Sequence, residues 1–253
     1  MRAWGGSPPT SADGGRLLCI GDVHGCASEL DALLRHVDAE DADRLVFLGD
    51  YVDRGPQSLD CVRIALEMKR SFPQTVLLRG NHEEMFLDYL GVGGSHGDVF
   101  LRNGGAQTLR SFGLRGPLGH NEPEAEEAVR EEIDLLREGL ALRFEEAGVV
   151  FVHAGVRPGV ALEAQAPEDL LWIREEFILA DPGFPWLVVF GHTPYRDLPL
   201  FDVPRKIGLD TGCVYGGHLS CLDLTEGRLH QVKRGERRAR TTDVARRLSG
   251  MAA

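Results

Sequence analysis

The chain has 253 residues, of which 43% are hydrophobic, and this is enough for one large α/β domain with a sizeable core. Its formal net charge of -11 argues against general nucleic-acid binding, because the phosphate backbone would be repelled, although a local basic patch is compatible with that charge. The 5 cysteines are widely spaced without a CxxC pair, so they indicate a reducing, cytoplasmic compartment instead of a disulfide framework or a thiolate zinc site. No apolar run approaches membrane-spanning length, and we expect no membrane contact.

The chain begins with a polar stretch and then alternates between strand and helix signals. Residues 1–15 are rich in Gly, Ser and Pro and predict a disordered leader, followed by a single domain over residues 16–232. A first strand over 16–20 runs into Asp22 and His24, which point to one side if the strand persists. A carboxylate and an imidazole on one side make half a metal site. The alternative interpretation is an ordinary turn in which the aspartate caps the helix that follows.

The second strand, over 44–48, leads into the sequence GDYVDRGP. It places Asp50 and Asp53 three residues apart, and two such carboxylates need a cation to offset their charge. Arg54 follows and presents a planar fork that suits phosphate oxygens. An exposed turn with a salt bridge is the alternative, but the apolar strand buries the start of this turn. A helix is predicted over 58–70.

The third strand signal, VLLRGNHE at 76–83, ends with an unusual pair of polar residues. Asn81 offers a neutral amide oxygen to a metal, whereas His82 can carry a proton at neutral pH. We therefore expect this pair to divide metal binding from acid catalysis.

A helical insertion is predicted over residues 86–142, between the strand units. It includes an acidic run over 122–138, where two arginines against eight acidic residues give a net charge of -6. This run is typical of a solvated helix face. Because the insertion lies outside the strand units, we expect it to border the site, and the sequence leaves open whether it is a lid or inert packing.

The second half of the chain repeats the pattern of a strand that ends in polar residues. His153 follows a strand over 148–152, and His192 follows one over 186–190. Arg174 is expected on a helix between these two strands, over 167–177.

Two segments near the C-terminus complete the predicted organisation. Residues 206–221 contain LDTG and a Gly-Gly turn and predict a closing β-hairpin. Tyr215 in this segment is expected to border the cleft, where it could stack a nucleotide base. Residues 233–253 form a basic tail that we expect to fray, with a weak anionic contact as the alternative.

The motifs GDVHG, GDYVDRGP, RGNHE, HAG and GHTP stand in this order, each after an apolar strand. Together they resemble the phosphoprotein phosphatase family of the calcineurin-like metallophosphoesterases, over Leu17 to Leu224. The resemblance implies an α/β fold, a β-sandwich of two mixed sheets flanked by helices with the site at the strand ends. It also implies two divalent metal ions. We expect manganese, with iron, zinc or magnesium as alternatives, because oxygen and imidazole ligands without thiolate suit all four.

The resemblance implies a role for each of the polar residues. Asp50 matches the carboxylate that bridges two metals, which would hold a hydroxide for in-line attack on phosphorus. His82 matches the general acid, and Asp53 matches the carboxylate that orients it. The other matches are the first-metal ligands Asp22 and His24, the second-metal ligands Asn81, His153 and His192, and the phosphate-binding arginines Arg54 and Arg174.

Two substrate classes fit this resemblance. GDYVDRGP and RGNHE are closer to the protein-phosphatase form, so we expect a serine/threonine protein phosphatase that acts on phosphorylated protein or small phosphoesters. LDTGCVYGGHLSCLDL looks like bacterial members and symmetrical dinucleoside tetraphosphatases, and hydrolysis of diadenosine tetraphosphate is the alternative. A third interpretation, a non-catalytic module that binds phosphorylated partners, is disfavoured because no matched position is substituted. The sequence predicts no particular oligomeric state.

Overall fold

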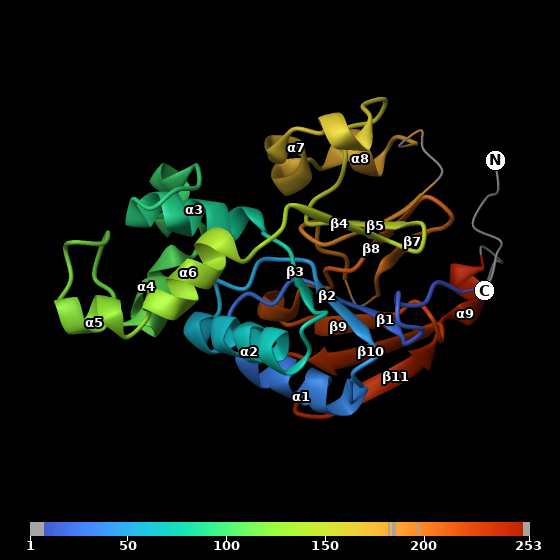
Figure 1. Ribbon diagram of the computed structural model, residues 1–253, viewed down its shortest axis with the longest axis horizontal. Helices are drawn as coiled ribbons and strands as arrows, with labels where there is room; N and C mark the ends of the chain where they lie inside the picture. The colour runs from blue at the N-terminus through green and yellow to red at the C-terminus, as the bar shows by residue number, and fades with distance from the viewer. Residues whose placement is uncertain (1–7, 182, 184–185, 197, 250–253) are drawn as a thin grey trace.

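The structure is a computed structural model that describes residues 8–181, 183, 186–196 and 198–249. Within these residues two sheets pack face to face, and helices cover the outer face of each sheet (Figure 1). This arrangement confirms the predicted α/β sandwich of two mixed sheets flanked by helices.

The first sheet is parallel on one side and antiparallel on the other. Its strands in spatial order are β11 (Ala239–Asp243), β10 (Arg228–Lys233), β9 (His218–Asp223), β1 (Leu17–Ile20), β2 (Arg44–Phe47) and β3 (Val76–Leu77). β1, β2 and β3 run parallel to one another, whereas β9, β10 and β11 pair antiparallel. The parallel pairs need crossover connections, which helices α1 (Ala27–Val37) and α2 (Ser58–Ser71) supply.

The second sheet is parallel in its centre and antiparallel at both edges. Its strands in spatial order are β4 (Arg143–Glu146), β5 (Val149–Val152), β6 (Leu187–Phe190), β8 (Lys206–Gly208) and β7 (Leu200–Asp202). β5, β6 and β8 run parallel, so their carboxyl ends meet at one edge of the sandwich.

The central strands are buried on both faces, which explains why their sequences are continuously apolar. Successive side chains point to opposite faces of a sheet. Leu17 and Cys19 of β1 therefore pack between the sheets with Phe151 of β5, whereas Leu18 and Ile20 pack beneath helices α1 and α2. Full burial of one leucine stabilises the fold by about 1.5–3 kcal/mol. The ends of these strands are consequently held in place by well-packed apolar side chains on both faces of the sheet.

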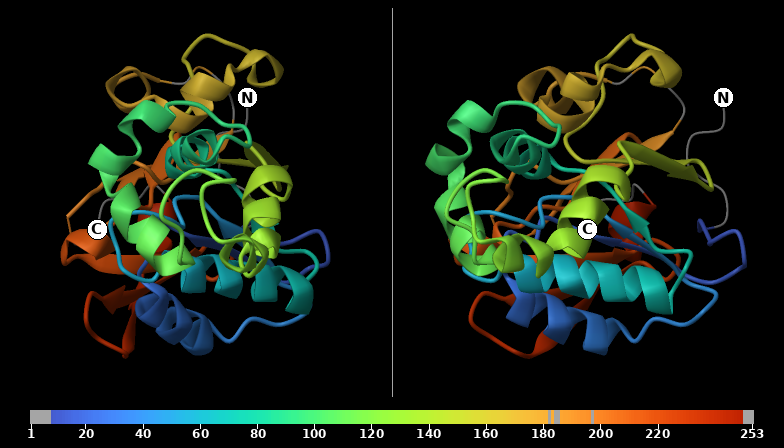
Figure 2. Two further views of the ribbon diagram at one scale, coloured as in Figure 1. Left: turned by 90° about the vertical axis from the view of Figure 1, so that its left-hand side faces the viewer. Right: turned by 60° about the vertical axis from the view of Figure 1, so that its left-hand side comes forward.

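Helices form the outermost layers of the molecule. α1 and α2 lie side by side on the first sheet, and α7 (Pro167–Trp172) and α8 (Glu175–Ile178) lie over the second (Figures 1 and 2). The single helix predicted over 167–177 is interrupted at Arg174, whose backbone angles of φ -131° and ψ -97° are not helical. No helix in the described residues has both the length and the apolar composition to cross a membrane.

The segment 86–142 is packed onto the first sheet and its helices. Phe86, Phe112 and Ile133 belong to the same hydrophobic core as α1 and α2. The acidic run also contacts α2, because Arg63 Nε donates to Glu132 Oε1 at 2.6 Å. The helical elements of this region are α3 (Asn81–Leu90), η1 (Gly97–Val99), η2 (Leu101–Asn103), α4 (Gly105–Phe112), α5 (Pro123–Glu127) and α6 (Arg130–Glu138).

The prediction of a β-hairpin over residues 206–221 is wrong. β8 pairs with β6 and β7 in the second sheet, whereas β9 pairs with β1 and β10 in the first. Residues 209–217, which include η4 (Cys213–Tyr215), therefore cross from one sheet to the other, and we call them the crossing loop. A Gly-Gly turn is typical of hairpins, but it does not determine which sheet each flanking strand joins.

The C-terminal segment differs from the frayed tail that we expected. Within residues 233–253, β11 pairs with β10, and helix α9 (Ala245–Leu248) follows. Val244 and Leu248 are buried in the core between the sheets. These two apolar side chains anchor a segment whose basic composition alone indicated a solvated tail.

The predicted leader lies partly outside the described residues, which begin at residue 8. Ser11 is buried, and its hydroxyl donates to the carbonyl oxygen of Ala42 at 2.6 Å. The Oγ1 of Thr225 donates to the carbonyl oxygen of Pro9 at 2.6 Å. Residues 9–11 are therefore packed against the domain, and residues 1–7 lie outside the described residues.

Candidate metal centre

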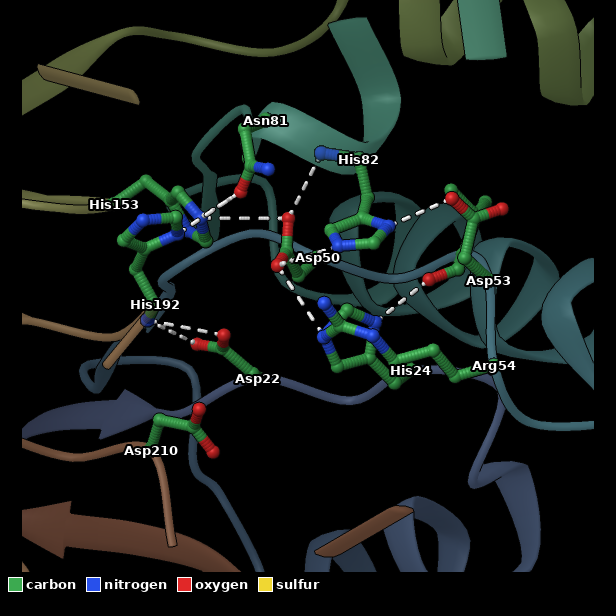
Figure 3. A network of polar contacts seen from close by, with 12 residues as sticks. Asp22, His24, Asp50, Asp53, Arg54, Asn81, His82, His153, His192 and Asp210 are labelled. Carbon is green, nitrogen blue, oxygen red and sulfur yellow. Dashed lines mark hydrogen bonds and ion pairs between the residues drawn. The ribbon is translucent and has the colours of Figure 1, made fainter. Parts of the chain in front are cut away.

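Polar residues from the ends of β1, β2, β3, β5 and β6 converge at one edge of the sandwich (Figure 3). Two clusters of possible ligand atoms share Asp50: one adds His24 and His82, the other His153 and His192. The atoms of each cluster lie within 4.8 Å of one another. The predicted site residues that meet here are Asp22, His24, Asp50, Asp53, Arg54, Asn81, His82, His153 and His192.

Tight turns position these side chains. His24, Asp50 and His192 have φ values of 44°, 54° and 61°, which lie in the left-handed region that non-glycine residues rarely adopt. Such backbone costs about 1–3 kcal/mol for each residue and concentrates at functional sites. Gly80 is required for a different reason: a Cβ atom at this position would lie 2.1 Å from Asp50 Oδ1. The glycines of the motifs therefore give the carboxylate room.

Asp50 is the centre of the arrangement. Its Oδ2 lies 3.3 Å from His24 Nε2, and its Oδ1 lies 3.4 Å from His153 Nε2. The backbone N–H of His82 donates to Oδ1 at 3.1 Å. Burial raises the pKa of Asp50, but His153, His82 and His24 outweigh burial and hold that pKa well below its usual value. An ionised carboxylate with both oxygens among imidazoles can bridge two cations.

Three side chains gather on one side of Asp50. Asn81 Oδ1 lies 3.0 Å from His153 Nε2 and 3.0 Å from His192 Nδ1. His153 Nδ1 lies 2.8 Å from the carbonyl oxygen of Leu48, so this nitrogen carries the proton and Nε2 is left as an acceptor. His24 has the equivalent arrangement, with Nδ1 2.8 Å from the carbonyl oxygen of Val52.

Buried groups without partners test whether these residues suit metal ions. His192 Nε2 is buried and has no hydrogen-bond partner in the described part of the chain. Burial raises the pKa of Asp22 well above its usual value, and the neighbouring Asp210 and Asp50 carboxylates add to that shift. An orphaned imidazole nitrogen and crowded carboxylates are costly unless a cation is present. Carboxylate, amide and imidazole donors without thiolate therefore fit one or two divalent metals.

His82 and Asp53 form a second, closely coupled pair. His82 Nδ1 lies 2.6 Å from Asp53 Oδ2, and both side chains are almost completely buried. The hydroxyl of Thr108 in α4 donates to Asp53 Oδ1 at 2.6 Å, and the Asp53 N–H donates to Thr108 Oγ1 at 2.8 Å. Burial raises the pKa of Asp53 to about 7, and the Thr108 hydrogen bond opposes that rise. The imidazole is thus fixed in orientation.

The two predicted arginines lie at different depths. Arg54 is half-buried; its Nη1 contacts His24 Nε2, and its guanidinium carbon lies 5.5 Å from the centre of the Tyr215 ring. Arg174 is exposed at the junction of α7 and α8. Burial lowers the pKa of His192, and the charges of His153 and Arg174 add to this effect, which places Arg174 within electrostatic reach of the centre.

Sequence reasoning missed three residues at this site. Glu83 is buried and accepts N–H groups from Gly80 and Asp50 at 2.8 and 2.9 Å, so it ties two motif turns together. Its position three residues after the helix N-cap is the signal that could have identified it. Asp210 follows β8 much as Asp50 follows β2, but it was assigned to a hairpin. Thr108 lies far away in the sequence, and no local pattern marks it.

Comparisons with known proteins agree with this geometry. The family model for calcineurin-like phosphoesterases matches residues 15–221. The chain is 34% identical over 210 residues to serine/threonine-protein phosphatase 1 of Salmonella typhimurium, covering 79% of this chain and 88% of that protein. It is 29% identical over 232 residues to an asymmetrical bis(5'-nucleosyl)-tetraphosphatase of Halalkalibacterium halodurans, covering 82% and 89%.

A solved structure described as a putative diadenosine tetraphosphatase is also similar. It has a TM-score of 0.62 and 26% identity, and the match covers 91% of this chain and 98% of that one. The family match spans most of the chain, and the residues that the motifs predicted meet around one buried carboxylate. The predicted family is therefore confirmed: this chain belongs to the calcineurin-like phosphoesterases and is a metal-dependent phosphatase.

Proposed function

We propose that the enzyme hydrolyses phosphate monoesters of serine and threonine in proteins. The observation that carries this proposal is the buried His82–Asp53 pair, with 2.6 Å between Nδ1 and Oδ2. The alkoxide of serine is a strongly basic leaving group and needs a proton as the bond to phosphorus breaks. A phosphate leaving group, as in a polyphosphate, needs that proton far less. An oriented general acid is therefore most useful on a phosphomonoester of an alcohol.

The proposed roles follow from contacts around Asp50. Asp22 and His24 would hold the first metal, and Asn81 would hold the second together with two histidines, His153 and His192. Asp50 contacts His24 on one side and His153 on the other and would serve both metals. Bound metals would supply Lewis acidity and an activated water. We propose manganese, and the same donors accommodate iron, zinc or magnesium.

His82 would deliver the proton to the leaving oxygen. Asp53 occupies its Nδ1, which leaves Nε2, 4.0 Å from Asp50 Oδ2, to face the reacting group. General acid catalysis of this kind is worth about two to four decades in rate. Arg54 and Arg174 would offset charge on the phosphoryl oxygens, because a guanidinium stays protonated and forms paired hydrogen bonds. The 5 free cysteines are all buried, which supports the proposed cytoplasmic location.

A second candidate substrate is a dinucleoside tetraphosphate. The crossing loop and the residues after β6 line a cavity of about 340 Å³ that includes Tyr195, Tyr215 and Gly216. The Tyr215 side chain is exposed, so its ring is available to a nucleotide base.

One enzyme preparation tests both candidates. The protein is stripped with chelator, reloaded with manganese, and assayed for kcat/KM on a phosphoserine peptide and on diadenosine tetraphosphate. We expect the peptide to have the higher value. A preference of about ten-fold for the dinucleotide, which equals 1.4 kcal/mol in transition-state binding, would overturn the proposal. Inactivity with every divalent metal would instead favour the non-catalytic binding module.

A further inference from the structure

Asp210 is a buried carboxylate beside the metal centre for which the proposed function gives no role. It lies in the crossing loop immediately after β8 and is only 5% exposed. Its Oδ1 accepts the N–H of Gly212 at 2.8 Å, and its backbone carbonyl accepts the N–H of Tyr195 at 2.8 Å. These contacts fix the carboxylate next to Asp22, where Figure 3 shows it.

Arg54 offsets part of the negative charge around Asp22, but the neighbouring Asp210 and Asp50 carboxylates outweigh it. Asp50 has imidazole contacts on both oxygens, from His24 and His153. In the described ranges, the ion pairs of His24, His82 and His153 are made with Asp50 and Asp53. The backbone N–H of His192 lies 3.0 and 3.1 Å from the two carboxylate oxygens of Asp22. Two neighbouring buried carboxylates in this setting call for a cation.

The proposed metal positions also differ in their number of ligands. The second metal position has four proposed ligands: Asp50, Asn81, His153 and His192. The first metal position has three: Asp22, His24 and Asp50. We propose that Asp210 is a positioning residue for the first metal, which it holds by adding a fixed negative charge next to Asp22. This inference rests on the proposed metal assignment. Groups that support a ligand in this way commonly change metal affinity by about 10–100-fold.

Substitution of Asp210 by Asn tests the charge while it keeps an acceptor for Gly212. Chelator-stripped protein is titrated with manganese by calorimetry, and bound metal is counted by elemental analysis. We expect Asp210→Asn to weaken manganese binding at the first metal position by about 10–100-fold and to leave binding at the second position unchanged. Unchanged binding at both positions, or equal weakening of both, would overturn the proposal.

Asp223 supplies a matched control. It is fully buried, and its Oδ1 accepts the N–H groups of Thr225 and Glu226 at 2.9 and 2.8 Å. It lies at the end of β9 and pairs with Leu18 near the start of β1, at the opposite end of that strand from Asp22. Asp223→Asn should leave manganese binding at both positions as in the unsubstituted protein. Equal loss of metal in this control would show that any buried aspartate has the effect, and it would contradict a specific role for Asp210.

Thermal stability with and without metal separates charge from structure. Asp210→Asn keeps the size of the side chain and an acceptor for Gly212, so the melting temperature of the metal-free protein should not fall. The gain in melting temperature on adding manganese should shrink. A lower melting temperature in both states would indicate a purely structural role and overturn the proposal. Asp210→Glu keeps the charge and should bind the first metal more tightly than Asp210→Asn; equal affinities would contradict the inference.

These measurements are made without substrate, so their outcome is independent of whether the proposed substrate is correct. A protein that binds two metals as described but ignores phosphopeptides would overturn the substrate assignment and leave the role of Asp210 standing. If the unsubstituted protein turns over phosphopeptides and Asp210→Asn leaves both metal affinities unchanged, the substrate assignment stands and the role of Asp210 is overturned.

Discussion

The core between the two sheets and the metal centre at its edge are built from the same strands, but burial has opposite consequences in the two regions. Leu17 and Asp22 lie five residues apart, and both are nearly inaccessible to solvent. Burial of Leu17 among apolar side chains stabilises the fold. Burial of Asp22 raises its pKa because the ionised carboxylate loses its hydration.

This difference explains why the turns of the centre can hold uncommon conformations. His24, Asp50 and His192 have positive φ values, and such backbone persists only where the surrounding structure determines it. Of the strands that precede these turns, β1 and β6 are completely buried, and β2 is buried except at Arg44. The core therefore offsets the cost of the metal centre, and substitutions in the two regions should separate stability from activity.

The largest effect on function should come from Asp50→Asn. Asp50 contacts histidines of both proposed metal positions, so loss of its charge should weaken both metals. Metal ions supply several kcal/mol of transition-state stabilisation, and the expected loss in kcat/KM is about 10³-fold or more. Elemental analysis and phosphopeptide kinetics measure the two effects. The exposed Asp60 of α2 is the control, since Asp60→Asn should change neither metal content nor kcat/KM. Two tightly bound metals in Asp50→Asn would show that the charge of Asp50 is not needed to hold them.

A slightly smaller effect is expected from His82→Asn. Only proton transfer should be lost, so the variant should keep two metals while turnover of phosphoserine falls by about two to four decades. Turnover of p-nitrophenyl phosphate should fall much less, because its leaving group needs little protonation. His120→Asn, at an exposed histidine, controls for the substitution itself. Loss of metal in His82→Asn would show that His82 is a ligand, as its place in the cluster with His24 and Asp50 would allow.

The same contrast explains how much the sequence could predict. The strand ends that carry Asp22, Asp50 and Asn81 were recognisable, because an apolar run followed by a polar turn is a local pattern. The apolar run predicts that the strand is buried, and the polar turn predicts where the ligand side chain lies. The structure therefore brings these side chains together where the motifs indicated.

The features that sequence reasoning missed depend on pairing across the fold. The crossing loop looks like a hairpin locally, and only the partners of β8 and β9 show that it joins two sheets. Asp210 was overlooked for that reason. Thr108 lies 55 residues from Asp53 in the chain, and its hydrogen bond to that carboxylate depends on how α4 packs. Residue types and spacing carry no information on such distant contacts.

A core substitution should show the complementary behaviour. Leu17→Ala removes a fully buried side chain between the sheets and should lower the free energy of unfolding by about 2–5 kcal/mol. Metal content and kcat/KM of the folded protein should not change, because the turn after β1 is held by other contacts as well. Urea unfolding measures the free energy of unfolding. Elemental analysis and kinetics at low temperature, where the variant is folded, measure metal content and kcat/KM. A folded variant with reduced metal content would show that the core and the centre are not separable.

The smallest effect concerns His230 on β10, a buried imidazole remote from the metal centre. Its Nδ1 lies 2.9 Å from Thr241 Oγ1, and its ring lies 5.4 Å from that of His36. Burial lowers the pKa of His230 from 6.5 to about 4, and the charges of His36 and Arg16 add to the shift, whereas Glu226 opposes it. The imidazole is therefore neutral in the folded protein at neutral pH.

Linkage between this proton and folding sets the sign of the effect. Because the pKa is 6.5 for an unperturbed imidazole and about 4 in the folded protein, the unfolded chain binds the proton more tightly. Stability should fall as the pH drops from 6.5 to about 4 and should show no further loss from this group below that range. With allowance for solvent screening, the loss should be about 1–2 kcal/mol. Urea unfolding of metal-free protein across this range, compared with His230→Gln, isolates the contribution, since glutamine does not titrate. An equal pH dependence in both proteins would show that groups other than His230 govern acid stability.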